Sequence, residues 1–270
     1  MTRLALDHIT AVDAAPDALC IAAAEAGCSG ICLFLEPMTV LPYMPAFDLL
    51  GDAAARRALR RHMEALGVVL DLAYPFTLAG RTDVGGFEAA LGCAAELGAG
   101  LVNVLVYDRD PDRRLDRFGA FCDLAERFGL GVAVEFYPVS QIRSLADALL
   151  LAAAIGRPGR VGVNADILHL MRSGGSIAEL AAAPAGTILY GQLCDGAADV
   201  AADRIDAEAS SARLLPGEGV FDLGGFVAAL PSTCPISVEI PRDAAIAAGE
   251  SRTERVRKAV EGVRQALDRG

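Results

Sequence analysis

Four polar side chains stand near the ends of otherwise apolar segments in the second half of the chain. They are Glu135 in AVEFYP, Asp166 in VNADILHL, Gln192 in LYGQLCD and Glu239 in SVEIPR. Three carboxylates and an amide oxygen that meet at one point repel one another unless a cation lies among them. Oxygen ligands of this kind suit Mg²⁺ or Mn²⁺, with Co²⁺ as a further option, whereas zinc is ordinarily bound by more His or Cys. The set predicts one divalent metal ion; the alternative is four ordinary strand ends that cap helices or pair with arginines.

Short apolar runs alternate with longer amphipathic segments from one end of the chain to the other. The runs expected to form strands are residues 4–10, 30–36, 68–76, 101–107, 131–138, 161–167, 187–195 and 236–241. Apolar residues at three- and four-residue spacing predict helices over 13–27, 48–66, 86–98, 115–129, 141–156, 175–183, 222–230 and 250–268. This alternation predicts an α/β protein, a single (β/α)₈ TIM barrel formed by residues 1–270 as one domain. The rival is an open doubly wound sheet, which usually has a glycine-rich fingerprint after its first strand, where this chain has AVDAAPDAL.

Two connections between expected elements are longer than the others. Residues 37–47 (PMTVLPYMPAF) follow the second strand, and residues 196–221, which include DRIDAE and ARLLPGEG, follow the seventh. Both leave the carboxyl ends of strands, the face on which barrel active sites are built. The sequence leaves open whether segment 37–47 caps a substrate or packs against a second subunit of a homo-oligomer.

Composition and charge restrict the class of partner. The net charge of −11, with no basic run, argues against nucleic acid, because proteins bind nucleic acid mainly by neutralising its phosphates. No apolar stretch of about eighteen residues is free of charges or breakers, so no membrane span is expected. The N-terminus lacks a signal-peptide pattern and the seven cysteines show no CxxC, which predicts a cytoplasmic protein that acts on a small molecule. Lys258, the single lysine, lies in the polar C-terminal helix, which argues against Schiff-base chemistry.

The order and spacing of these polar residues resemble the xylose-isomerase-like TIM barrels, a superfamily of sugar-phosphate isomerases and epimerases that also includes AP endonuclease family 2. The resemblance covers essentially the whole chain and rests on Glu135, Asp166-x-x-His169, Gln192 with Asp195, Arg213 before Pro216-Gly217-Glu218-Gly219, and Glu239. It implies that Glu135, Asp166, Gln192 and Glu239 bind the metal. Many relatives have His where this chain has Gln192. Gln occurs in relatives that resemble hydroxypyruvate isomerase and 3-dehydroshikimate dehydratase, which turns the prediction away from ketose 3-epimerases.

The predicted metal site indicates a class of reaction. Such an ion can bind a carbonyl and a neighbouring hydroxyl, lower the pKa of the intervening C–H and stabilise the enediolate. Glu135 or Glu239 is the expected general base, and the opposite carboxylate returns the proton. The prediction is an isomerase or epimerase that acts on a small sugar or hydroxy-keto acid. The alternative is a dehydratase (lyase) resembling 3-dehydroshikimate dehydratase, in which the enolate expels a β-hydroxyl group. DNA repair is disfavoured because three histidines are too few for a three-metal cluster.

Five further residues are assigned provisional roles. By the resemblance, His169 is a substrate hydrogen-bond partner or proton shuttle, or else an ordinary core or loop histidine. Arg213 is expected to clamp an anion or hydroxyl of the substrate, because a guanidinium can form two parallel bonds, or else to pair with nearby acids. Asp195 is expected to orient a ligand or a loop. Tyr74 and Phe76, which end the third strand, are candidates for an apolar substrate wall or for core packing.

Overall fold

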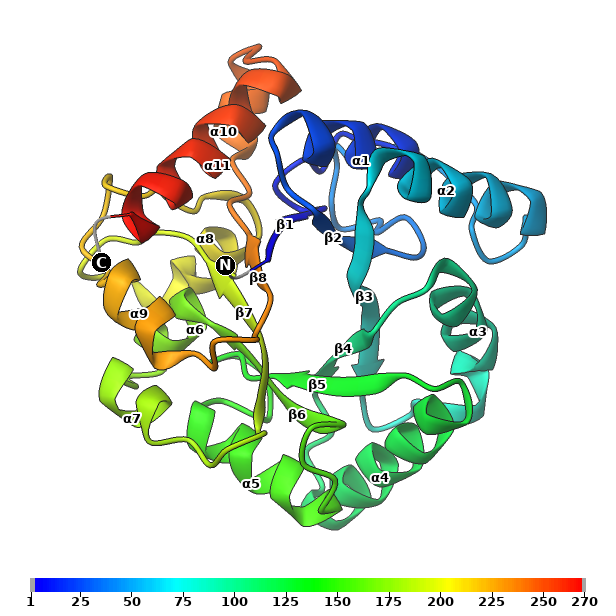
Figure 1. The fold of residues 1–270 in the computed structure, drawn as a ribbon. Coiled ribbons are helices and arrows are strands. Elements are labelled where there is room, and N and C mark those ends of the chain that lie inside the picture. Colours follow the sequence, from blue (N-terminus) through cyan, green and yellow to red (C-terminus); the bar gives the residue numbers. More distant parts are fainter. Residues whose placement is uncertain (1–2, 269–270) are drawn as a thin grey trace.

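The computed structural model describes residues 3–268, and its eight strands form a closed parallel barrel (Figure 1). The strands are β1 Leu4–Asp7, β2 Gly30–Phe34, β3 Val69–Leu78, β4 Leu101–Val106, β5 Gly131–Glu135, β6 Val161–Asp166, β7 Ile188–Leu193 and β8 Ile236–Val238. Each strand pairs with the next, and β8 pairs with β1 through Leu4 and Ile236 to close the sheet. This closure confirms the predicted TIM barrel and excludes the open sheet.

The helices form a ring around the strands (Figure 1). They are α1 Pro16–Glu25, α2 Ala53–Leu66, α3 Glu88–Leu97, α4 Pro111–Arg127, α5 Leu145–Ile155, α6 Ile167–Arg172, α7 Ile177–Ala181, α8 Ile205–Ser211, α9 Leu223–Ala229, α10 Asp243–Ala247 and α11 Arg252–Leu267. Two 3₁₀ turns, Val84–Phe87 and Ala202–Arg204, precede α3 and α8. The caps follow from local sequence: the Ser144 and Ser251 side chains accept amide hydrogens at the starts of α5 and α11. Gly98 ends α3 in the left-handed conformation that favours glycine.

The structure corrects several predicted boundaries at the carboxyl ends of strands. The sequence predicts a strand over 161–167, but β6 ends at Asp166, whose side chain caps a short helix, α6. The predicted loop 196–221 contains helix α8, and a short helix, α10, follows β8. β8 ends at Val238, so Glu239 lies just beyond it. Apolar runs continue past these strand ends because the segments over the barrel mouth are buried too, and an apolar pattern alone does not distinguish them from strand.

Side chains from all eight strands are buried, as expected for parallel strands covered by helices. The seven cysteines are all buried, and none forms a disulfide. Within residues 3–268, none of the helices combines the length and apolar composition needed to cross a bilayer.

Candidate active site

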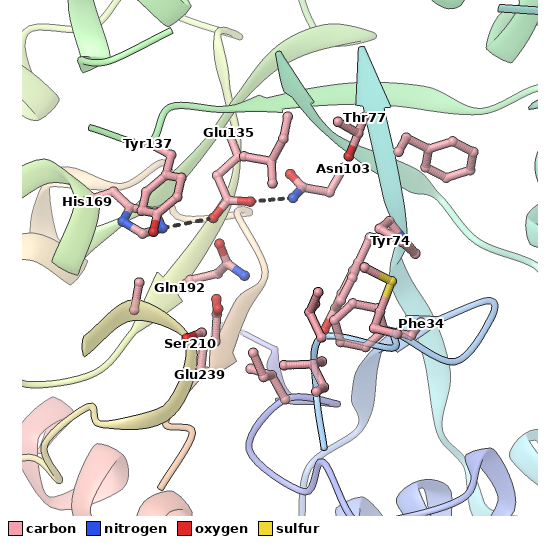
Figure 2. Close-up of a pocket in the computed structure, with 18 of the residues that line it drawn as sticks. Phe34, Tyr74, Thr77, Asn103, Glu135, Tyr137, His169, Gln192, Ser210 and Glu239 are labelled. Atoms are coloured by element: carbon pink, nitrogen blue, oxygen red, sulfur yellow. Dashed lines mark hydrogen bonds and ion pairs between the residues drawn. The ribbon is translucent and has the colours of Figure 1, made fainter. Parts of the chain in front are cut away.

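A cavity of about 630 Å³ opens at the carboxyl ends of the strands, a size typical of small-molecule sites. Its two sides differ in chemistry. Figure 2 shows Glu135, His169, Gln192 and Glu239 on one side, and Phe34 and Tyr74 across the cavity. We call the first side the acidic half. It comprises Glu135, His169, Gln192, Arg213 and Glu239, which line the cavity, together with the fully buried Asp166, which contacts His169 and Arg213. The second is the apolar half, which comprises Ile9, Phe34, Met38, Val40, Leu41 and Tyr74.

The acidic half contains a compact group of metal-ligating atoms. Glu135 ends β5, Asp166 ends β6, and His169 lies in the first turn of α6. The His169 Nε2 atom lies 3.4 Å from Glu135 Oε1 and 3.8 Å from Asp166 Oδ2. One ligand atom from each of the three residues lies within 4.8 Å of the others. His169 was expected at a strand end, but it is on a helix, because the Oδ1 atom of Asp166 accepts the Leu168 amide hydrogen and starts that helix.

Arg213 donates hydrogen bonds to two of the predicted ligands, Asp166 and Glu239. Its Nη1 atom donates to Asp166 Oδ2 at 2.6 Å, its Nη2 to Glu239 Oε1 at 2.9 Å, and its Nε to the Ala209 carbonyl at 2.9 Å. The side chain is 2% exposed. Burial lowers the pKa of Arg213, but Asp166 and Glu239 outweigh it and raise the pKa well above its ordinary value. The guanidinium is therefore permanently charged and lies against the carboxylates. It lines the cavity, but its donors point at protein groups, as in the ion-paired alternative of the sequence reading.

The pKa values of the two paired acids shift in opposite directions. Burial raises the pKa of Asp166, but Arg213 and His169 lower it, and the net shift is downward. Burial raises the pKa of Glu239 well above its ordinary value despite Arg213, and Asp7, Asp166 and Glu135 raise it further. The Oε2 atom of Glu239 is buried and has no hydrogen-bond partner among the described residues.

These contacts fit a divalent cation. Glu135, Asp166 and Glu239 together bear three negative charges when ionised, and Arg213 supplies one positive charge, so the group lacks two positive charges. An unpartnered buried carboxylate oxygen is costly unless a cation or donor meets it. The donor set of carboxylates and one imidazole suits a divalent metal ion.

A chain of amide side chains joins the two ends of the acidic half. Asn103 Nδ2 donates to Glu135 Oε2 at 2.5 Å, and Asn164 Nδ2 donates to Asn103 Oδ1 at 3.2 Å and to Gln192 Oε1 at 2.5 Å. Gln192 Nε2 in turn faces Asp7 Oδ2 at 3.4 Å. Ionised carboxylates can only accept hydrogen bonds, so Glu135 at one end of this network and Asp7 at the other determine which way each amide group points. Asn103 and Asn164 therefore hold Glu135 and Gln192 in one geometry.

The sequence reading missed Asp7, Asn103 and Asn164. Asp7 ends β1 and is fully buried, and the Tyr74 hydroxyl donates to its Oδ1 atom. Burial raises the pKa of Asp7 to about 6, although the bonds from Tyr74 and the Ile9 amide lower it. Each of the three is a polar residue inside an apolar strand pattern (LALD, LVNVLV, VGVNAD), the same signal that identified the four predicted ligands.

The remaining predicted residues lie as follows. Tyr74 lines the cavity, and Phe76 lines it while packing mainly on Phe87 and Phe121, with ring centroids 5.4 and 5.3 Å away. Asp195 lies outside the cavity lining and orients the loop after β7. Its carboxylate accepts amide hydrogens from Gly196, Gly217, Gly219 and Phe221.

The segment 37–47 covers the apolar half of the mouth. Met38, Val40 and Leu41 line the cavity, and Phe47 stacks on His8 with ring centroids 6.1 Å apart. His8 itself is buried, with Nε2 on the Ala14 carbonyl and Nδ1 accepting the Phe34 amide hydrogen. The segment therefore contributes side chains to the cavity, as the first of its two expected roles requires.

The chain belongs to the xylose isomerase-like TIM barrel family, whose model matches residues 20–268. No curated protein was found to match significantly. Among solved structures, the IolI protein with a bound zinc atom shares 19% identity and a TM-score of 0.79, with 100% of this chain and 99% of that chain covered. A fusion of a xylose isomerase-like TIM barrel with 4-hydroxyphenylpyruvate dioxygenase shares 21% identity and a TM-score of 0.77; 97% of this chain matches, which spans 42% of that protein.

Two further similar structures carry reaction names. The probable 3-DHS dehydratase AsbF from Bacillus anthracis shares 13% identity, with 99% and 100% of the two chains covered and a TM-score of 0.75. D-psicose 3-epimerase, solved in the presence of D-fructose, also shares 13% identity, with 99% of each chain covered and a TM-score of 0.73. The family thus contains enzymes of more than one reaction class, and at these identities the likeness establishes the fold.

Proposed function

We propose that this chain is a metal-dependent isomerase or epimerase that moves a proton next to the carbonyl of a small sugar or hydroxy-keto acid. The observation that carries the proposal is the gathering of Glu135, Asp166 and His169 atoms within 4.8 Å at the barrel mouth. Glu239 lies outside that group, but it shares Arg213 with Asp166, and its Oε2 atom has no hydrogen-bond partner among the described residues. We take residues 1–270 as one functional domain, with a divalent ion such as Mn²⁺, Mg²⁺ or Co²⁺ as cofactor. The family membership and the epimerase among the similar structures support this choice.

The proposed ligands are the four residues predicted from the sequence, Glu135, Asp166, Gln192 and Glu239, with His169 as a further candidate within reach. The bound ion would supply Lewis-acid polarisation of a substrate carbonyl. Arg213 neutralises part of the acidic charge and fixes one oxygen each of Asp166 and Glu239. The amide chain through Asn103 and Asn164 fixes Glu135, so its Oε1 atom stays directed at the cavity side that holds His169.

Proton transfer falls to the carboxylates of the acidic half. Glu135 comes from the end of β5 and Glu239 from the segment just after β8, at two separate points of the acidic half (Figure 2), so one can remove a proton from a bound substrate and the other can return it. His169, within 3.4 Å of Glu135, can pass a proton to a substrate oxygen. The same first step would serve a dehydratase if a β-hydroxyl then left. AsbF, named as a probable dehydratase, is among the similar structures, so this remains the second candidate.

Metal binding and proton exchange test the proposal together. Purified protein should bind Mn²⁺, measured by calorimetry, and should exchange a substrate C–H with deuterated solvent in a reaction that EDTA stops and Mn²⁺ restores. Asp166→Asn should weaken metal binding because it removes a charge, while an asparagine can still cap α6. Asp52→Asn is the matched control, since Asp52 caps α2 in the same way on the surface. Failure of the wild-type protein to bind any divalent ion would contradict the proposal, and release of water from the substrate would favour the dehydratase.

A further inference from the structure

The positive charge at the cavity is already neutralised by the protein. Among the described residues that line the cavity, Arg213 and His169 are those able to carry a positive charge. The three kinds of nitrogen of Arg213 bond to Ala209, Asp166 and Glu239, and the side chain is 2% exposed. His169 faces Glu135 and Asp166. The proposed divalent ion would be taken up by the substrate carbonyl and its neighbouring hydroxyl, so a phosphate or carboxylate elsewhere on the substrate would have to displace an internal ion pair.

The amides of the loop that follows β7 are also occupied. Barrel enzymes often bind phosphate with the loops that follow strands seven and eight, because clustered backbone N–H groups attract anions. Here Asp195 fills that position after β7. Its two carboxylate oxygens accept amide hydrogens from Gly196, Gly217, Gly219 and Phe221 at 2.8 to 3.1 Å.

The rim adds negative charge. Asp206 lines the cavity from α8, and the Tyr137 hydroxyl donates to its carboxylate. With Glu135 and Glu239, the lining contains three acids against one arginine. The whole chain bears a net charge of −11, which also repels anions from the surface.

The apolar half offers little to a hydroxyl group. Phe34 and Tyr74 pack edge to face with ring centroids 4.1 Å apart, and Met38 and Leu41 extend this surface from segment 37–47. The Tyr74 hydroxyl proton is donated to Asp7, so it points away from a ligand in the cavity. An unpaired hydroxyl buried against such a surface is unfavourable, whereas a methyl or methylene group gains from leaving water.

From these contacts we infer that the substrate is an uncharged hydroxy-ketone with one deoxygenated end, such as a deoxyketose, and bears neither a phosphate nor a carboxylate. This inference rests on the proposed function and narrows its substrate class. The carbonyl and its neighbouring hydroxyls lie toward Glu135 and Glu239, and the deoxygenated end lies against Phe34, Tyr74 and Leu41. The inference therefore excludes hydroxy-keto acids from the substrates proposed above.

The test compares matched ketoses that differ at carbon 6. Solvent deuterium exchange by the Mn²⁺-loaded protein is measured for a panel of 6-deoxyhexuloses, the parent hexuloses and their 6-phosphates. We expect kcat/KM to be about ten-fold or more higher for a 6-deoxyhexulose than for its parent, the cost of burying one unpaired hydroxyl. We expect the 6-phosphate to be poorer still. A 6-phosphate that reacts best, or a panel in which no deoxyhexulose exchanges although the protein holds Mn²⁺, would overturn the inference.

A positive charge introduced on the apolar half tests whether anionic substrates are excluded because the cavity lacks an available cation. Val40 lines the cavity and is 75% exposed, so Val40→Arg places a cation there without disturbing the core. This variant should lower KM for a hexulose 6-phosphate about two-fold to five-fold relative to the wild type, the usual strength of an ion pair at an exposed position. Leu150→Arg, on α5 and 71% exposed, adds the same charge outside the cavity lining and should leave KM unchanged. Equal KM values in the two variants would contradict the inferred position of the substrate end.

The proposed function and this inference fail in different ways. Loss of the proposed function appears as absence of Mn²⁺ binding in calorimetry. Loss of the inference appears as a preference for phosphorylated or fully hydroxylated ketoses in a protein that binds Mn²⁺ normally, whereas proton exchange with no ketose at all would count against the proposed function.

Discussion

The acidic and apolar halves of the barrel mouth are built by different means. In the acidic half the side chains are tied to one another: Arg213 bonds two carboxylates, and the amide chain bonds Glu135 and Gln192. In the apolar half the contacts are ring packing and a surface segment, 37–47, with Val40 largely in solvent. A charged site needs fixed geometry because misplaced charges are costly, whereas apolar packing tolerates change. The first half therefore suits chemistry, and the second suits the choice of substrate.

The largest expected effect follows from removing one acid of the acidic half. Glu239→Gln should lower kcat by about 10²-fold to 10⁴-fold, as loss of a general acid or base usually does. Its stability should change less than that of an Arg213 variant, because the glutamine oxygen can still accept a hydrogen bond from Arg213 and Asp166 stays paired with Arg213. Steady-state kinetics with Mn²⁺ measure the change in kcat, and thermal unfolding in EDTA measures the change in stability. Glu36→Gln, an exposed acid just after β2, should change neither; full activity of Glu239→Gln would remove Glu239 from catalysis.

Stability of the acidic half depends on Arg213. Arg213→Met leaves Asp166 and Glu239 without their buried cation, and breaking such a pair costs about 3–5 kcal/mol. Urea unfolding in EDTA should show this loss, and Mn²⁺ should restore part of it. Arg242→Met is the comparison, since Arg242 lies 3.9 Å from Glu218 near the surface, and a pair of that kind contributes about 0–1 kcal/mol. Equal losses in both variants would contradict the role given to Arg213.

A smaller effect is expected from the amide chain. Asn103→Ala removes the donor to Glu135 Oε2 and should weaken Mn²⁺ binding by about 10-fold to 100-fold, the usual effect of removing a group that orients a metal ligand. Calorimetry measures the affinity directly. Thr77→Ala, which also lines the cavity from the neighbouring strand β3, should leave the affinity unchanged. The idea of a preorganised acidic half would be lost if Asn103→Ala bound Mn²⁺ like the wild type.

The smallest effect concerns Tyr74, at the border of the two halves. Burial raises the pKa of Asp7 to about 6 from an ordinary value near 3.8, so the folded protein loses stability as pH rises between these values. The Tyr74 hydroxyl bonds to this carboxylate and favours its charged form. Tyr74→Phe should therefore cost about 1 kcal/mol at pH 8, where Asp7 is ionised, and less at pH 5. Thermal unfolding in EDTA at both pH values checks it; a loss independent of pH would contradict the coupling.

The sequence was sufficient for the barrel and for the position of its main acidic residues. Eight apolar runs became eight strands, and Glu135, Asp166 and Gln192 lie at the ends of three successive strands because parallel strands end on one face. Glu239 follows β8 at the same mouth. To predict that these residues lie together, only the order and direction of the strands were needed, and the alternating pattern of strands and helices provides both.

The bonds between the residues were not predictable in the same way. Parallel strands are apolar on both sides, so the pattern does not say that Asn103 and Asn164 point inward and meet across 61 residues of sequence. The position of Arg213 depends on an irregular loop fixed by Asp195, whose contacts span up to 26 residues. The same loop contains α8, which the sequence reading left as an unstructured connection.

The burial of all seven cysteines has a practical consequence for spectroscopy. Burial raises the pKa of each thiol, to about 11 or 12 for Cys28 and Cys122, so the natural side chains react slowly with maleimides. A cysteine introduced at Val40 would then be the reactive position, and a fluorophore attached there would sit directly over the cavity. Its emission would report each arrival and departure of a ligand without any need to follow turnover.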